Sequence, residues 1–386
     1  MFDKSESLFP VKRDYIYLSH CAIGPMYRPA ADAAKAFIDT QVNHGLLLHE
    51  HYAELVTTFR QKAATFLKTA PENIAYVSNT AEGINLIANG YPFESGDQVV
   101  SYVHEFPSNH HPWALQKKRG VELVLLSDVD PFGDLPVYRP CGWSMQELEE
   151  KTTDRTRVVA ISHVQFASGY AADLKQLGDF CRERNVDLVI DAAQSMGVLP
   201  LYPEEYGIAA IATSAWKWLL ASRGAGLLYT SPEFREKLQD TMAGGGMMKH
   251  RLDFLNHTWD PFENARRFEY STLPWEHLVA IETVLEELFL RYEIEAISAE
   301  VFRLQDRMLE FIDTKKLKPL IFPPQNRSGI LALATDKDPM VLANALKQQG
   351  VVMTAQSKYL RLAPHFYLTE EEILEAAEIL NALAGA

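Results

Sequence analysis

The chain has 386 residues, of which 47% are hydrophobic and 23% charged, a composition typical of soluble globular proteins. Its 37 Lys and Arg residues oppose 51 Asp and Glu residues, and the formal net charge of −14 disfavours binding to nucleic acid or to an anionic membrane surface. No stretch approaches the ~18 uninterrupted apolar residues of a membrane helix, and residues 1–15 lack the apolar core of a secretory signal. The three cysteines, Cys21, Cys141 and Cys181, are too few for a disulfide framework, so we expect a cytoplasmic protein.

Along the chain, residues 28–69 predict helix with a break near 43–45, because apolar residues recur there at three-to-four spacing. Beyond this segment, short β-branched runs alternate with helical ones. The expected strands are 74–77, 98–103, 121–126, 157–161 and 187–190, and the expected helices are 81–88, 109–119 and 174–184. Such alternation is typical of βαβ units and of a mostly parallel sheet covered on both faces.

The last third of the chain predicts a second, smaller unit. Residues 275–313 read as a connecting helix, and strand, helix, strand, strand and helix are expected at 329–334, 339–349, 351–354, 359–362 and 369–383. We expect three parts. They are an N-terminal segment (1–24) associated with the small domain and the active site, a large domain (25–270), and a connecting helix with a small α+β domain (271–386).

Several common motifs are absent or incomplete. Two groups of histidines lack the HExxH spacing that places two imidazoles on one helical face, so loop or surface histidines are the better interpretation. These groups are His44, His49 and His51, and His104, His110 and His111 around Glu105. The chain also lacks GxSxG, GxxxxGK[ST] and a complete GxGxxG, so hydrolase, P-loop and dinucleotide-binding functions lose their usual support.

Two segments carry distinctive chemistry. In 188–194, LVIDAAQ, an apolar strand ends at Asp191 and places a carboxylate at the edge of a parallel sheet where ligands bind; a helix-capping role is the alternative. In 212–219, ATSAWKWL, Lys217 lies between two tryptophans, where it either snorkels or is desolvated with a lowered pKa. Together, the strand-end Asp and the apolar-pocket Lys favour pyridoxal phosphate (PLP), which needs an imine-forming amine and a carboxylate opposite its pyridinium nitrogen.

Other segments offer what else this cofactor needs. Residues 77–85, VSNTAEGIN, are a strand end followed by Thr80 at the start of a helix, a typical phosphate site, although any capped helix has this pattern. Phe106 follows a strand and is either a stacking partner for the ring or a core residue. Arg361 is a lone cation in an apolar strand, placed either to bind the carboxylate of an amino-acid substrate or at the surface.

Ordered motifs over nearly the whole chain resemble those of the class V aminotransferase family of fold type I PLP enzymes, which contains cysteine desulfurases, selenocysteine lyases and isopenicillin N epimerase. The motifs are YLSHCAIGP from residue 17, NTAEGIN, EFPSNHHPW, ISHVQFASG, DAAQS, SAWKWL, GGGM, RRFEYST and YLRLAP. The resemblance implies an α/β fold with a large, mostly parallel α/β/α sandwich domain and a small C-terminal α+β domain.

The resemblance also implies a role for each of nine residues within these motifs. They are Lys217 (covalent bond to the cofactor), Asp191 (pyridinium nitrogen), Gln194 (phenolic oxygen), Thr80, Ala81 and Ser214 (phosphate), Phe106 (ring stacking), Arg361 (substrate carboxylate) and Thr272 (phosphate of the partner subunit). The role of Thr272 implies a homodimer with shared active sites.

Departures from the family pattern bear on the reaction. Phe106 stands where desulfurases have a histidine, and no cysteine lies between Phe322 and Leu360, where desulfurases carry their persulfide-forming nucleophile. We therefore expect an enzyme that acts at Cα or Cβ of a small amino acid, as an epimerase or a C–S lyase without a persulfide cysteine. A true aminotransferase, a cysteine desulfurase and a noncatalytic PLP-fold binding protein are the alternatives. Candidates for a second acid, each with ordinary packing as the alternative, are His20, Cys21, His163 and Gln165.

Overall fold

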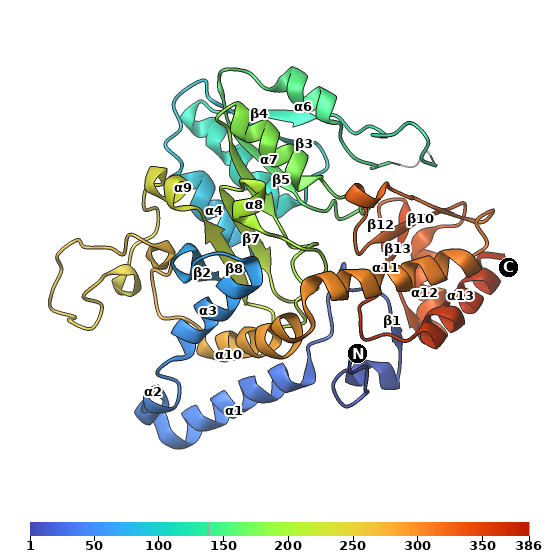
Figure 1. Cartoon of the computed structure of the whole chain (residues 1–386), viewed down its shortest axis with the longest axis horizontal. Helices are drawn as coiled ribbons and strands as arrows, with labels where there is room; N and C mark the ends of the chain where they lie inside the picture. Colours follow the sequence, from blue (N-terminus) through green and yellow to red (C-terminus); the bar gives the residue numbers. More distant parts are fainter. Residues whose placement is uncertain (137–138, 386) are drawn as a thin grey trace.

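The computed structural model describes residues 1–136 and 139–385, so Ala386 of the predicted small domain lies outside the described residues. A seven-stranded sheet forms the centre of the larger domain, in the order β2-β8-β7-β6-β5-β3-β4 (Figure 1). Its strands are β2 (Ile74–Val77), β3 (Gln98–Tyr102), β4 (Glu122–Leu126), β5 (Thr156–Ser162), β6 (Asp187–Asp191), β7 (Ala210–Ser214) and β8 (Gly226–Thr230).

The sheet is mixed rather than wholly parallel. Strands β4, β3, β5, β6 and β7 pair in parallel, whereas β8 runs antiparallel to both β7 and β2. Alternate residues of each strand bury against opposite layers, as expected for a sheet covered on both faces. In β5, Val158 and Ala160 belong to one buried cluster and Val159 and Ile161 to the other. The prediction of a mostly parallel sheet is therefore confirmed, with β8 as the exception.

Helices cover the two faces and connect the strands. Those of the larger domain are α1 (Arg28–His44), α2 (Leu48–His51), α3 (Leu55–Leu67), α4 (Thr80–Gly90), α5 (His111–Leu115), α6 (Met145–Lys151), α7 (Leu174–Glu183), α8 (Pro203–Tyr206) and α9 (Pro232–Lys237). The predicted break near 43–45 is confirmed, because α1 ends at His44 and is followed by Gly45, whose φ of 53° favours glycine.

The predicted connecting helix is divided. Helix α10 (Trp275–Val284) continues through a π-helical turn (Leu285–Leu290), and α11 (Ile294–Phe311) begins after Glu293, whose φ is 59°. The left-handed backbone at Glu293 ends regular helical hydrogen bonding there. Helix α11 then packs against the C-terminal helix α13 (Glu370–Gly385) (Figure 1).

The small domain contains a four-stranded antiparallel sheet in the order β12-β13-β10-β9. Its elements are β9 (Leu317–Pro319), β10 (Leu331–Thr335), α12 (Pro339–Gln348), β12 (Thr354–Gln356) and β13 (Tyr359–Leu362), followed by α13. The single strand predicted at 351–354 is wrong. The chain there forms two short strands, β11 (Val351–Val352) and β12, which belong to different sheets.

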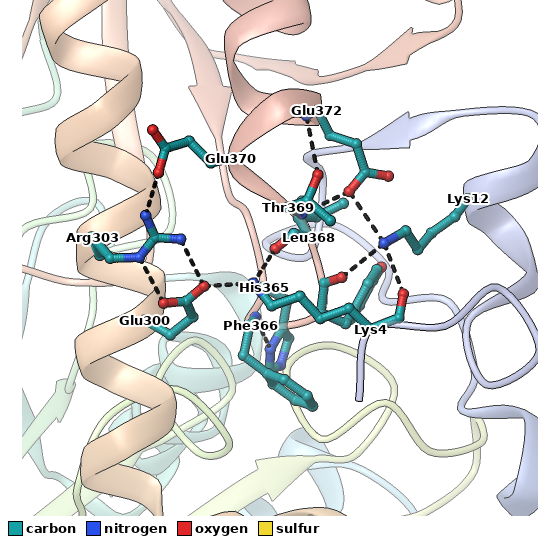
Figure 2. A network of polar contacts seen from close by, with 11 residues as sticks. Lys4, Lys12, Glu300, Arg303, His365, Phe366, Leu368, Thr369, Glu370 and Glu372 are labelled. Carbon is teal, nitrogen blue, oxygen red and sulfur yellow. Dashed lines mark hydrogen bonds and ion pairs between the residues drawn. The ribbon is translucent and has the colours of Figure 1, made fainter. Parts of the chain in front are cut away.

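The N-terminal segment lies against the small domain. Strand β1 (Ile16–Tyr17) pairs in parallel with β11. The ammonium group of Lys4 contacts Glu300 of α11 and the carbonyl oxygen of Leu368, both at 2.5 Å. Lys12, whose side chain is 7% exposed, forms an ion pair of 3.2 Å with Glu372 (Figure 2). Charged side chains of the first residues thus bind them to α11 and α13, while the domain boundaries at 24 and 270 stay predictions.

The part of the chain that the structure describes contains no membrane-spanning helix and no metal-binding cluster. None of its helices is long and apolar enough to cross a membrane. None of its groups of His, Cys, Asp and Glu side chains has an arrangement that would hold a metal ion.

Candidate active site

A cavity of about 430 Å³ opens at the carboxyl ends of β5, β6 and β7, where the N-terminal segment and the small domain meet the large sheet. Ligands of open α/β sheets bind at this edge, and the volume lies within the usual range for small-molecule sites. Eight of the nine residues predicted for the site line this cavity: Thr80, Ala81, Phe106, Asp191, Gln194, Ser214, Lys217 and Arg361.

Asp191 is the last residue of β6 and is 4% exposed. One oxygen of its carboxylate accepts a hydrogen bond of 2.9 Å from the backbone N–H of Ala193. Burial raises the pKa of the Asp191 carboxyl to about 6, while that hydrogen bond and the charge of Lys217 lower it. A cationic group opposite Asp191 would therefore stabilise its ionised form.

Lys217 follows β7 and reaches the same cavity. Burial lowers the pKa of its ammonium group below the ordinary value, and the charge of Asp191 opposes this shift. A lowered pKa increases the fraction of neutral amine, the form that attacks a carbonyl carbon. The Nζ atom lies 5.4 Å from the centre of the Phe106 ring, so the amine and the aromatic face border one space.

Helix α4 begins beside the same cavity. The side chain of Asn79 caps α4 by accepting a hydrogen bond of 2.9 Å from the backbone N–H of Glu82. The Oγ of Ser214 lies 3.0 Å from the backbone nitrogen of Thr80 and 2.9 Å from its Oγ1. Backbone N–H groups, two hydroxyls and the positive end of the helix dipole thus converge where an anion would bind.

Gln194 is held from both sides. Its Nε2 donates to the carbonyl oxygen of Cys21 at 2.8 Å, and its Oε1 accepts from the indole N–H of Trp218 at 3.1 Å. These partners fix the orientation of the amide and leave the second hydrogen of Nε2 for a ligand. Phe106 packs edge to face against Phe166, with ring centres 5.4 Å apart, and remains 41% exposed.

Arg361 brings the small domain to the cavity. It lies in β13 and is 3% exposed. Its Nη1 donates to the carbonyl oxygen of Phe166 at 2.5 Å. Its buried Nε has no hydrogen-bond partner within the described residues. A buried guanidinium N–H without a partner costs free energy, so an anionic ligand in the cavity would complete this site.

These features fit PLP together with an amino acid. The helix start of α4 suits a phosphate, Asp191 suits a protonated ring nitrogen, Lys217 suits a covalent imine, and the unpartnered Nε of Arg361 suits a carboxylate. The individual roles of these residues remain predictions.

Of the other predicted residues, all but Cys21 lie away from this cavity. Thr272 is exposed and does not line the cavity of its own chain. Of the four candidates for a second acid, Cys21 alone lines the cavity. His20 is bound to the carbonyl oxygen of Ala363 and the hydroxyl of Tyr367, and His163 faces a different cavity, beside α7 and α11. The side chain of Gln165 donates to the carboxylate of Glu105.

The sequence reasoning missed several residues that the fold brings to this place. Ser162 lines the cavity from the end of β5 and is the cross-strand neighbour of Asp191. Thr354 and Gln356 line it from β12. The position of Ser162 at a parallel strand end was a usable signal. No pattern marked β12, because three residues are too few to show periodicity.

The family model for aminotransferase class-V matches residues 17–363. The chain belongs to the aminotransferase class-V family. It is 25% identical over 400 aligned residues to a probable cysteine desulfurase of Methanothermobacter thermautotrophicus, with 97% of this chain and 96% of the relative covered.

Solved structures of C-DES share the fold of this class-V chain at 19% identity. One is the complex of the cystine C–S lyase C-DES with its reaction product cysteine persulfide, with a TM-score of 0.87 over 97% of this chain and 99% of C-DES. The other is a C-DES mutant with glycine covalently linked to the PLP cofactor, also with a TM-score of 0.87, over 98% and 99% of the two chains. The predicted family and the predicted fold type I architecture of two unequal domains are thereby confirmed.

Proposed function

We propose that this class-V protein binds PLP and cleaves a C–S bond at Cβ of a small amino acid. The observation that carries the proposal is the single cavity shared by Lys217, Asp191, Arg361 and the start of α4. These groups come from both domains, and each meets a different requirement of the cofactor or of an amino-acid substrate.

When bound, PLP supplies an electron sink that labilises the bonds at Cα of an attached amine. Asp191 would accept a hydrogen bond from the ring nitrogen and hold it protonated. Arg361 would bind the substrate carboxylate with two N–H groups and orient the amino acid. Lys217 has a lowered pKa, so its neutral amine would receive the proton from Cα.

The remainder of the reaction is an elimination. Loss of the Cα proton and departure of a thiolate from Cβ, followed by addition of water and loss of ammonia, gives a thiol, pyruvate and ammonium, with no external oxidant or reductant. This outcome requires one base for the Cα proton, a role for Lys217, and the same proton would then pass from Lys217 to the departing thiolate.

Two observations favour this reaction over its alternatives. Epimerisation needs an acid on the face opposite the base, and three of the four candidate residues lie outside the cavity. Desulfurases carry a nucleophilic cysteine on a small-domain loop, whereas residues 322–360 contain none, and of the three cysteines only Cys21, from the N-terminal segment, lines the described cavity.

The proposal is tested with the purified protein loaded with PLP. We expect a visible absorption band, and borohydride reduction should attach the cofactor to the peptide that contains Lys217, as detected by mass spectrometry. Lys217→Ala should abolish attachment and turnover, whereas Lys175→Ala, which changes an exposed lysine of α7, should leave both unchanged.

The substrate is identified by offering L-cystine, L-cysteine, cysteine conjugates and keto acids while pyruvate and released sulfur are measured. Pyruvate in equal amount to thiol or persulfide is the expected result. Racemised amino acid or amino-group transfer to a keto acid would replace the C–S lyase proposal with epimerisation or transamination. Absence of any spectral response to amino acids would favour a noncatalytic binding protein.

We further propose that the enzyme is a homodimer in which Thr272 reaches the partner's phosphate site. The segment between α9 and α10 extends away from the body of the molecule (Figure 1). Large apolar side chains on it are exposed in the single chain: Met242, Leu252, Phe254, Leu255 and Trp259. Such a concentration of exposed apolar groups is uncommon on a monomer and suits a second copy of the chain.

A further inference from the structure

A second buried carboxylate lies beside the proposed active site. Glu105 immediately precedes Phe106 and is 6% exposed. Its Oε1 accepts hydrogen bonds of 2.8 Å from the backbone N–H of Ser162 and from Nε2 of Gln165. Its Oε2 accepts from Nδ2 of Asn109 at 3.3 Å and from the hydroxyl of Ser162. The carboxylate therefore meets only donors, and two of the four come from Ser162.

Ser162 connects this carboxylate with the cavity. It lines the cavity and is the cross-strand neighbour of Asp191. Because its hydroxyl hydrogen is donated to Glu105, the oxygen has only lone pairs left for a ligand. Ser162 and Asp191 thus present two adjacent hydrogen-bond acceptors to the cavity.

We propose that Glu105 is a positioning residue that keeps Ser162 a hydrogen-bond acceptor, so that Ser162 and Asp191 together select a ligand ring with a protonated nitrogen. This inference rests on the proposed function, since PLP is such a ring. It assigns Glu105 an effect on the ligand through Ser162, without contact between Glu105 and the ligand.

The effect depends on the ionisation of Glu105. The negative charge of Asp191, on β6, raises the pKa of Glu105. Burial raises the pKa of the Tyr102 phenol, on β3, and the charge of Glu105 adds to that shift. Its partners on β5 and on the turn after Phe106, which are Ser162, Gln165 and Asn109, are uncharged. His163 remains neutral over the relevant range, because burial lowers its pKa to about 3.

Burial is the largest cause of the shift at Glu105, and it raises the pKa to about 7 in the cofactor-free protein. Below that pH, the protonated carboxyl donates to Ser162, whose own hydrogen then turns towards the cavity. A donor there opposes a ring N–H group. Affinity for a protonated ring should therefore fall as the pH decreases through about 7.

The test uses pyridoxamine 5′-phosphate, which has the same ring as PLP but forms no imine with Lys217. Its affinity is measured from pH 5.5 to 8.5 by fluorescence titration of cofactor-free protein. For the wild type we expect at least a fivefold loss between pH 8 and pH 6. Glu105→Gln imitates the protonated acid, so it should bind at least fivefold more weakly at pH 8 and show a flatter pH dependence. Glu122→Gln, at an exposed site on β4, is the matched control and should behave as the wild type.

Two further measurements separate this role from a purely structural one. A ring analogue with carbon in place of the ring nitrogen should bind to wild type and Glu105→Gln with equal affinity. Ser162→Ala should weaken pyridoxamine phosphate as Glu105→Gln does, and the double variant should be no weaker than either single variant, because both act through one hydroxyl.

The role of Glu105 would be overturned if Glu105→Gln lost the same affinity for pyridoxamine phosphate and for the carbon analogue, or if the effects of the two substitutions added up in the double variant. Neither outcome would affect the proposed function. Failure of the wild type to bind either PLP or pyridoxamine phosphate would overturn the proposed function as well. Folding is checked independently through the melting temperature of the cofactor-free protein. In the wild type it should decline more steeply from pH 5 to 7 than in Glu105→Gln, because the buried acid must ionise over that range.

Discussion

Asp191 illustrates how a single residue is placed at a cost to stability. The carboxyl is buried, burial raises its pKa to about 6, and within the described residues it accepts a hydrogen bond only from the N–H of Ala193. The folded, cofactor-free chain therefore holds a proton that the unfolded chain releases at lower pH. A residue with this penalty is useful only when a ligand brings the compensating positive charge.

This penalty leads to a prediction for Asp191→Asn. In the wild type without cofactor, the free energy of unfolding should decrease as the pH rises from about 4 to about 6, by about 3 kcal/mol for a shift of this size. The variant should lack this decrease and be more stable than the wild type at pH 7.5, although its turnover should be lost. Urea unfolding at pH 4.5 and 7.5 measures the difference, and equal pH dependence in the two proteins would contradict the prediction.

Cys21 is the residue that distinguishes C–S cleavage from desulfuration through an enzyme persulfide. It is the only one of the three cysteines that lines the described cavity, and its carbonyl oxygen binds Gln194. We expect Cys21→Ser to retain C–S cleavage within about threefold, because the backbone contact persists and elimination uses no thiol. Steady-state release of pyruvate measures this; a hundredfold loss, with a persulfide trapped on Cys21 of the wild type by alkylation, would identify a desulfurase instead.

At the scale of elements, the close approach of two segments positions the lysine. The N–H of Gly24 donates to the carbonyl oxygen of Trp216 at 2.8 Å. A Cβ atom on Gly24 would lie 2.1 Å from the carbonyl oxygen of Lys217, much closer than van der Waals contact allows. The N-terminal segment can therefore approach the backbone of Lys217 this closely only because residue 24 is a glycine.

We predict that Gly24→Ala separates these segments. The expected loss of stability is about 1–3 kcal/mol, the usual cost of overpacking, and the PLP absorption band should shift or weaken as Lys217 moves. Gly133→Ala is the control, because a Cβ atom there would meet no other atom within 4 Å. Its φ of 83° adds backbone strain, so the variant should lose some stability and keep the wild-type spectrum. Denaturation and absorption spectra of the three proteins measure the effect, and an unchanged spectrum in Gly24→Ala would refute it.

The elements differ in how far the sequence predicts them. Strand β2 has the predicted bounds, and α7 agrees to within one residue, because β2 is a short, wholly buried apolar run and α7 has helical periodicity and the cap Asp173. The antiparallel direction of β8 depends on contacts far along the chain and has no local signature. The site shows the same division between local and distant signals. Asp191 and Lys217 could be predicted because each is a charged residue in an apolar segment, whereas the contact between Glu105 and Ser162 could not, because it joins residues 57 positions apart.

At the scale of the whole molecule, the exposed apolar segment before α10 carries the prediction of a dimer. Leu255 is 92% and Phe254 81% exposed in the single chain. We expect the wild type to sediment as a dimer and the variant Phe254→Asp/Leu255→Asp to shift towards monomer, because charges at a buried interface core are unfavourable. Ile321→Asp, on the small domain, is the control and should remain dimeric; a monomeric wild type would contradict the proposed role of Thr272.

The pairing of β1 with β11 has a consequence for biosynthesis. Ile16 lies opposite Val351, so β1 acquires its partner strand only after more than 300 further residues have been synthesised. Cys21 and Ala22, which border the cavity, follow directly after this strand. Nascent chains and premature termination products that end before Val351 therefore lack Thr354, Gln356 and Arg361, which line the cavity from the small domain, and they also lack the strand that holds the N-terminal segment in place.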